Sequence, residues 1–96
     1  MSGMPMTANN PNVGTADASV PRWNLIVWDD PINSLDYIAE VLRRHFGYPR
    51  PTCEALTLQV HSDGQAIIAT GLRERVEADL QTLHDYGVQS TLERVT

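Results

Sequence analysis

The feature that most limits the fold of this chain is a change in sequence character near residue 22. Residues 1–22 are rich in Asn, Pro, Gly, Ser, Thr and Ala and carry only scattered apolar side chains. Such a segment cannot bury enough surface to offset the entropy lost on ordering, so we expect a flexible N-terminal arm. The fold is then built from residues 23–96, about 75 residues, which suffices for one small domain with little room for a deep catalytic cleft.

The charge of the chain argues against nucleic acid as a partner. The 96 residues have a formal net charge of -5, contain no lysine, and have their seven arginines spread along the sequence. A nucleic-acid-binding surface needs clustered cations, whereas only Arg43 and Arg44 are adjacent here.

The expected location follows from apolar content and cysteine usage. No window approaches the roughly 18 apolar residues of a membrane span, and the first residues lack the pattern of a secretory signal. The single cysteine, Cys53, cannot form an internal disulfide, which fits a reducing compartment. We therefore expect a cytoplasmic monomer that does not act at a membrane.

Apolar periodicity predicts three strands and three helices in the order βααβαβ. This order favours an α+β sandwich in which a small three-stranded antiparallel sheet carries three helices packed on one face. Short β-branched or aromatic runs predict the strands, at 23–28, 65–70 and 88–95. Helical spacing predicts the helices: from Leu35 to Phe46 with an N-cap at Asn33 or Ser34, from an N-cap at Thr52 to Gly64, and from Leu72 to Gly87.

Two adjacent carboxylates, Asp29 and Asp30, follow the first predicted strand. They repel each other unless a cation or several hydrogen-bond donors lie nearby, which would suit the lip of a cation-binding site. The alternative is that they end the strand and cap the turn that follows. His61, near the end of the second predicted helix, is the other candidate for chemistry, although a histidine there can simply interact with the helix dipole.

A metal site built from Asp29, Asp30 and His61 has to be weighed, because carboxylate and imidazole suit zinc or iron. The spacing of about 30 residues, without an HxxxH or CxxC element, makes this signal weak. The motifs GxGxxG, GxSxG, HExxH and the P-loop are missing from the sequence as well. The sequence therefore predicts neither an enzyme nor a bound metal or cofactor.

Three segments together resemble the ClpS adaptor family of Clp proteases, in what looks like its actinobacterial variant. They are VWDDPINSLDYIAEVL, then LQVHSDGQA after a break with two prolines, and STLE near the end. The family has an Asn-Asp-Asp turn after the first strand and a Val-His-x-x-Gly segment after the second helix. The resemblance covers residues 23–96, and it implies the βααβαβ ClpS fold with a surface pocket for the first residue of a substrate.

The resemblance also implies roles for individual residues. Asp29 would contact the substrate's α-ammonium group, with Asp30 beside it and His61 facing the same group. A free N-terminus has a pKa of roughly 7.7–8.0 and presents three donors, which carboxylates and neutral imidazole can accept. An apolar wall would favour Phe, Tyr, Trp and Leu, each gaining roughly 1.5–3 kcal/mol on burial. Six residues match this wall, and each could equally be ordinary core: Leu35, Ile38, Val41, Thr57, Val60 and Val88.

Two departures from the family pattern concern this site. Trp28 stands in place of the family's asparagine and cannot accept a hydrogen bond, because indole is only a donor. Recognition of the ammonium group would then rest on Asp29, His61 or Asn33. The turn from Asp30 to Ser34 is also one residue longer than the common form, and Thr57 replaces a larger apolar residue.

The resemblance implies a partner, the N-terminal domain of a ClpA- or ClpC-type AAA+ unfoldase. Glu74 matches an acidic contact at the start of the third helix, and Asp79 stands where the family has a lysine; both could also belong to a solvated helix face. The prediction is an adaptor that delivers proteins with a bulky hydrophobic first residue, an N-degron, with residues 1–22 as the arm on which the unfoldase pulls. The alternatives are an unfoldase modulator that does not read N-termini, and a small metal-dependent enzyme.

Overall fold

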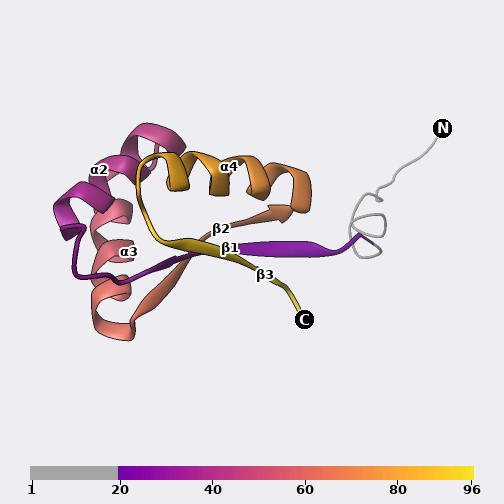
Figure 1. Ribbon diagram of the computed structural model, residues 1–96, viewed down its shortest axis with the longest axis horizontal. Helices are drawn as coiled ribbons and strands as arrows, with labels where there is room; N and C mark the ends of the chain where they lie inside the picture. Colours follow the sequence, from indigo (N-terminus) through magenta and orange to yellow (C-terminus); the bar gives the residue numbers. More distant parts are fainter. Residues whose placement is uncertain (1–19) are drawn as a thin grey trace.

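The computed structural model describes residues 20–96, which form a three-stranded sheet and three helices (Figure 1). The sheet is antiparallel with the strand order β2-β1-β3, and this confirms the predicted α+β architecture. Of the predicted N-terminal arm, residues 1–19 lie outside the described part. The elements are β1 (Arg22–Trp28), α2 (Leu35–Phe46), α3 (Arg50–Asp63), β2 (Gln65–Leu72), α4 (Arg73–Asp85) and β3 (Ser90–Arg94).

Strand β1 is central because its apolar run is buried from both sides. Leu25 and Val27 point into the hydrophobic core, while Ile26, on the opposite face of the sheet, is only 4% exposed. A bulge in β2 leaves Ile68 without a partner on β1, so that Ile68 and Ala69 both contribute to the core. The hydroxyl of Tyr48 donates to the carbonyl of Ile68 at 2.7 Å and so gives this carbonyl a hydrogen-bond partner at the bulge.

The helices close the core from one side of the sheet. Helix α4 lies along the strands, and α2 and α3 pack together at one end of the sheet, on the left in Figure 1. Each helix contributes a narrow buried stripe, as an amphipathic helix does. The fully buried residues are Ile38, Val41 and Leu42 from α2, Cys53 and Val60 from α3, and Val76 and Leu83 from α4.

Helix starts were predicted with mixed success. Ser34, one of the two predicted caps, is the N-cap of α2, where its side chain accepts a hydrogen bond from the amide of Tyr37. The prediction that Thr52 caps α3 is wrong, since the helix begins at Arg50 after Pro49. Proline fits the first turn of a helix, because the amide hydrogen it lacks would have no helical partner there.

The strand ends also differ from the prediction. Strand β2 continues to Leu72, and β1 begins at Arg22, opposite it. Strand β3 begins only at Ser90, because Gly87 and Val88 still belong to the turn that ends α4. Gly87 has φ of 80°, a conformation that favours glycine, and the amide of Val88 donates to the carbonyl of Leu83.

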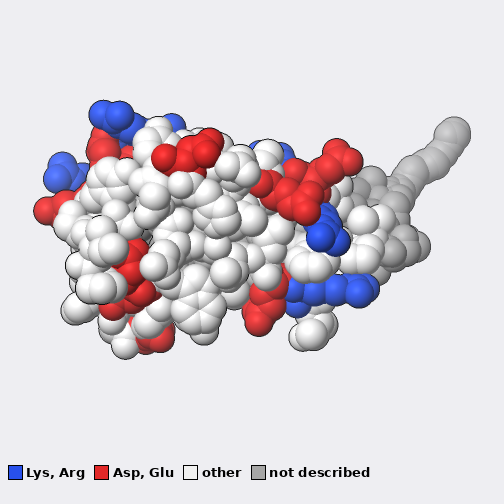
Figure 2. Space-filling model, in the orientation of Figure 1, with Lys and Arg blue, Asp and Glu red and all other residues white. Residues whose placement is uncertain are grey.

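The surface charges do not form a basic patch on the face drawn in Figure 2. The arginines there lie beside acidic side chains, and the middle of this face is uncharged. Ion pairs within helices account for part of this pattern: Glu40 pairs with Arg43 and Arg44, and these contacts lower the pKa of Glu40 to about 2. Within residues 20–96, no helix is long and apolar enough to cross a membrane.

Candidate functional site

A cavity of about 440 Å³ lies where β1 passes into α2. Its size falls in the range of sites for small ligands, about 300–1,000 Å³. Most of the residues that the sequence analysis selected for cation binding line this cavity, although the chain brings them from two distant segments. The lining residues are Asp29, Asp30, Pro31, Asn33, Ser34, Leu35 and His61.

Asp29 and His61 face each other on the rim of the cavity. The Nδ1 atom of His61 lies 3.9 Å from Oδ2 of Asp29, and the two side chains are 66% and 38% exposed. The amide of Asp29 donates to the carbonyl of Gly64 at 3.0 Å, which holds the end of β1 beside the end of α3. With the lone pair of the imidazole nitrogen free, two acceptors at this separation can both reach one ammonium nitrogen at about 2.8 Å. The pair is therefore open to a cationic ligand.

Asp30 has a different role, because its oxygens are used within its own turn. Oδ1 accepts hydrogen bonds from the amides of Ile32 at 2.7 Å and Asn33 at 2.8 Å, and Oδ2 accepts one from Nδ2 of Asn33 at 3.1 Å. Asp30 is only 9% exposed. The two adjacent carboxylates are thus divided: Asp30 shapes the turn, as the capping interpretation expects, and Asp29 is left for a ligand.

The hydrogen bonds to Asp30 also set its ionisation. They lower the pKa of its carboxyl below the usual 3.8, chiefly through the backbone amide of Asn33. A lowered folded-state pKa means that the ionised form stabilises the fold. This stabilisation is present above pH 3.8 and is lost as the pH falls through the lowered value.

The turn is tethered to the segment between α4 and β3. Nδ2 of Asn33 donates to the carbonyl of Gly87 at 2.8 Å, and the hydroxyl of Tyr37 donates to the carbonyl of Tyr86. Neither contact is predictable from local sequence, because each joins residues about fifty positions apart. They fix Asn33, and with it the wall of the cavity, against the body of the domain.

Trp28, which was included among the predicted amine-binding residues, lies outside the cavity. It follows Val27 on β1, so its side chain projects from the sheet face opposite the core. There its Nε1 donates to Oγ1 of Thr91 on β3 at 2.8 Å. The structure therefore assigns Trp28 to contacts across the sheet.

The predicted apolar wall is only partly exposed to the cavity. Leu35 lines it, whereas Thr57 is only 4% exposed and lines a separate hollow of about 430 Å³ between α2 and α3. The hydroxyl of Thr57 bonds to carbonyls of its own helix, those of Cys53 and Glu54. The other four residues are at most 2% exposed and belong to the hydrophobic core: Ile38, Val41, Val60 and Val88.

The metal-site alternative has no matching cluster in the described residues. Over 20–96, no three side chains of His, Cys, Asp or Glu are placed so that they could hold one ion. Asp30, which that alternative needs as a ligand, has both oxygens bonded to its own turn.

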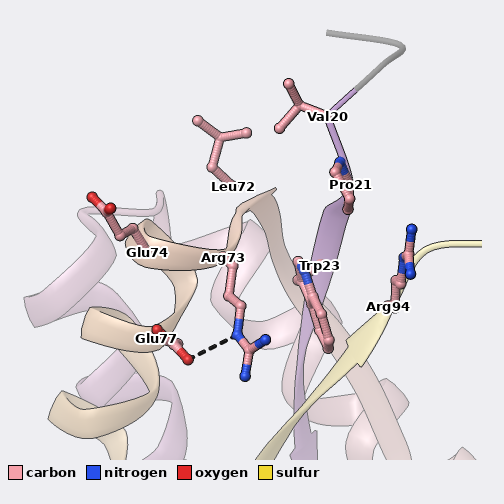
Figure 3. A pocket seen from close by; sticks show the side chains of 8 residues that line it. All are labelled: Val20, Pro21, Trp23, Leu72, Arg73, Glu74, Glu77 and Arg94. Carbon is pink, nitrogen blue, oxygen red and sulfur yellow. Dashed lines mark hydrogen bonds and ion pairs between the residues drawn. The ribbon is translucent and has the colours of Figure 1, made fainter.

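A second cavity, of about 590 Å³, lies at the other end of β1 (Figure 3). The guanidinium of Arg73 lies 4.8 Å above the ring of Trp23 and pairs with Glu77 at 3.0 Å. Glu74, one of the two predicted unfoldase contacts, lines this cavity, and its carboxylate points away from Arg73 and Trp23. Two arginines and two glutamates line this cavity, so its wall offers an ammonium group no net negative charge.

Asp79, the other predicted unfoldase contact, is engaged inside the domain. Its Oδ1 lies 2.7 Å from Nε2 of His45, and its side chain is 19% exposed. The contact joins α4 to α2. An acid at this position therefore has a structural partner within the domain.

Comparison with known proteins agrees with this fold. The model of the family described as "ATP-dependent Clp protease adaptor protein ClpS" matches residues 18–92. The ClpS adapter proteins of Mycobacterium marinum and Mycobacterium leprae are each 41% identical over 78 residues, which cover 81% of this chain and 77% and 72% of theirs.

A solved structure is similar in fold. The structure of Agrobacterium tumefaciens ClpS2 bound to L-phenylalaninamide matches with a TM-score of 0.63 at 16% sequence identity, covering 78% of this chain and 98% of that one. The family consists of adaptors and not of enzymes. The family match over most of the chain and the identity to the mycobacterial proteins show that this chain belongs to the ClpS family of ATP-dependent Clp protease adaptors.

Proposed function

We propose that this adaptor captures proteins through a free N-terminus with a bulky hydrophobic first residue and delivers them to a Clp AAA+ unfoldase. One observation carries the proposal: Asp29 and His61 place a carboxylate oxygen and an imidazole nitrogen 3.9 Å apart on the rim of a cavity of about 440 Å³. The ligand named for the Agrobacterium protein, L-phenylalaninamide, has a free α-amine next to an aromatic side chain and supports the same chemistry here.

The amine-binding part of the site would recognise the positive charge of the substrate's α-ammonium group. A free α-ammonium group offers three donors and one positive charge, and both suit a carboxylate and a neutral imidazole. Asp29 and His61 are exposed enough to be reached, and Asp30 adds a second negative charge behind them. An internal or blocked residue carries no charge at this position, so that only true N-termini would be bound.

The side-chain part of the site would lie between α2 and α3. Leu35 and Pro31 offer apolar surface in the cavity, and Thr57, one turn before His61 on α3, lines a separate hollow between the two helices. The hydroxyl hydrogen of Thr57 is already used within its helix, so the residue leaves no unsatisfied donor toward an apolar ligand. Buried core residues beneath this surface make it rigid.

Peptides that differ only in their first residue test the proposal. Those beginning with Phe, Tyr, Trp or Leu are expected to bind with a Kd in the micromolar range or below, and a Gly-initiated peptide roughly 10- to 150-fold more weakly, because it lacks the buried side chain. Fluorescence anisotropy with the full chain gives these constants. If no peptide shows saturable binding, the capture proposal is wrong, as the alternative of an unfoldase modulator that does not bind N-termini predicts.

Delivery requires a docking surface, and we infer that it includes Glu74 at the start of α4. The proposed partner is the N-terminal domain of a ClpA- or ClpC-type unfoldase. Glu74 is exposed, lies more than 40 positions from Asp29 along the chain, and carries a charge that points outward (Figure 3). Asp79 is a weaker candidate, because its carboxylate already pairs with His45.

The Glu74→Arg substitution is expected to weaken binding to the unfoldase N-terminal domain about tenfold and to leave peptide binding unchanged, because it reverses one rim charge. Glu93→Arg is the matched control, since Glu93 is also exposed but lies on β3. Surface plasmon resonance with the immobilised domain measures both. Equal effects of the two substitutions would show that net charge, and not a contact at Glu74, governs docking.

We also infer that the adaptor acts as a cytoplasmic monomer. Cys53 is buried, burial raises the pKa of its thiol, and such a thiol reacts poorly. A free thiol without a disulfide among residues 20–96 is consistent with a reducing compartment. A monomer would leave both the cavity at Asp29 and the surface at Glu74 open to partners.

A further inference from the structure

We propose that the side-chain carbonyl oxygen of Asn33 is the third acceptor for the substrate's α-ammonium group, beside Asp29 and His61. This inference rests on the proposed function and specifies how the site works without the asparagine that the family has at the position of Trp28. It depends on the direction in which the Asn33 amide faces, on what surrounds it, and on the placement of Trp28.

The orientation of the Asn33 amide is fixed by chemistry. Nδ2 lies 3.1 Å from Oδ2 of Asp30 and 2.8 Å from the carbonyl oxygen of Gly87, and it donates one hydrogen to each. A flipped amide would place Oδ1 against a carboxylate and a carbonyl, two acceptors that it would repel. Both hydrogens of the amide are therefore used inside the protein, and the oxygen is the remaining polar atom of the group.

The oxygen itself is available. Among residues 20–96 no hydrogen bond to Oδ1 of Asn33 is formed, although the residue is only partly exposed. Its amide nitrogen, in contrast, donates two hydrogen bonds. Asn33 lines the same cavity as Asp29 and His61. An ammonium group has three N–H donors, so a carboxylate, an imidazole and an amide oxygen provide one acceptor for each.

The position of Trp28 leaves this role open. Its indole is a donor that is already bonded to Thr91 on the outer face of the sheet. Asn33, in contrast, is held by Asp30 within its turn and by Gly87 on a different segment before any ligand arrives. Such a preorganised acceptor costs little conformational entropy on binding. Asn33 would thus be a specificity-determining residue for the free amine.

A thermodynamic cycle tests the inference. The full chain and its Asn33→Ala variant are titrated with a Phe-initiated peptide and with a matched peptide in which a 3-phenylpropanoyl group replaces Phe, so that only the amine is missing. The wild-type chain is expected to bind the peptide with the amine much more tightly than the peptide without it. In the variant the ratio of the two Kd values is expected to be about tenfold smaller. Tyr37→Phe is the control, because it removes the other tether to the same turn and leaves Asn33 intact.

Three outcomes would overturn the inference. Asn33→Ala could weaken both peptides equally, which would make Asn33 a structural residue only, or it could leave the amine preference unchanged. Tyr37→Phe could also reduce the preference as much as Asn33→Ala does, which would assign the effect to the tether. A wild-type chain that binds neither peptide would instead contradict the proposed function itself.

A second measurement does not depend on the variant folding. In the wild-type chain, the ¹³Cγ resonance of Asn33 is expected to shift when the Phe-initiated peptide is added and to shift much less with the peptide that lacks the amine. Equal shifts with the two peptides would contradict a hydrogen bond between Asn33 and the amine.

Discussion

Replacing Asp29 with Asn is expected to weaken the binding of a Phe-initiated peptide about 100-fold and to leave the free energy of unfolding nearly unchanged. The substitution keeps the shape of the side chain and removes the negative charge that would face the ammonium group, and a hydrogen bond to a charged group contributes about 1.5–3 kcal/mol. Folding should tolerate it, because Asp29 is 38% exposed and lies 3.9 Å from the imidazole of His61.

The matched control for this prediction is Trp28→Phe, at the last residue of β1 and directly before Asp29. It removes the hydrogen bond to Thr91 and is expected to cost about 0.5–1.5 kcal/mol of stability with no change in the peptide Kd. Anisotropy titrations and urea denaturation of both variants separate binding from folding. A Trp28→Phe variant that binds as poorly as Asp29→Asn would contradict the placement of the site.

Leu42→Ala is expected to have the largest effect on stability, about 2–5 kcal/mol. Leu42 is 0% exposed and lies in the core that α2 shares with the sheet, so its loss leaves a cavity that a small domain cannot readily fill. Since such domains have a total stability of about 5–15 kcal/mol, this is a substantial fraction.

Leu58→Ala provides the comparison for Leu42→Ala. Leu58 lies on α3 with 63% of its surface exposed, and the same change there is expected to alter stability by at most about 0.5 kcal/mol. Thermal and urea unfolding of the two variants measure the difference. Similar losses for both would mean that the core is not organised as described.

The order of strands and helices could be predicted because it depends on local periodicity. The run at 23–28 is apolar on both faces, as in a central strand, and α2 shows one apolar stripe between a serine cap and Gly47. The start of α3 could not be read correctly, because the two prolines that can begin a helix are also the residues that end one. The start of β3 depends on the Gly87 turn, whose extent is set by contacts with α4.

The candidate site was predictable in part. The sequence indicated Asp29, Asp30 and His61 from residue type and from the family resemblance, and the structure places all three around one cavity. The sequence could not show that Asp30 shapes the turn while Asp29 is left for a ligand, because this depends on which backbone amides donate to Asp30. The outward placement of Trp28 could have been read from strand alternation, because Val27 before it faces the core.

The apolar wall shows where sequence reasoning stops. Leucine, isoleucine and valine in a binding pocket and in a core have the same spacing and the same chemistry, and only burial distinguishes them. Ile38 and Val60 are at most 1% exposed, whereas Leu35 reaches the cavity. The contact of Asn33 with Gly87 was likewise hidden, because it joins residues 54 positions apart.

The central claim is that this adaptor recognises the positive charge of a free chain end. Isothermal titration calorimetry of the full chain with a Phe-initiated peptide and with its N-acetylated counterpart tests it most directly, because the two ligands differ only at the amine. We predict a Kd in the micromolar range or below for the free peptide and a loss of at least about 100-fold on acetylation. Equal affinities for the two peptides would contradict the claim.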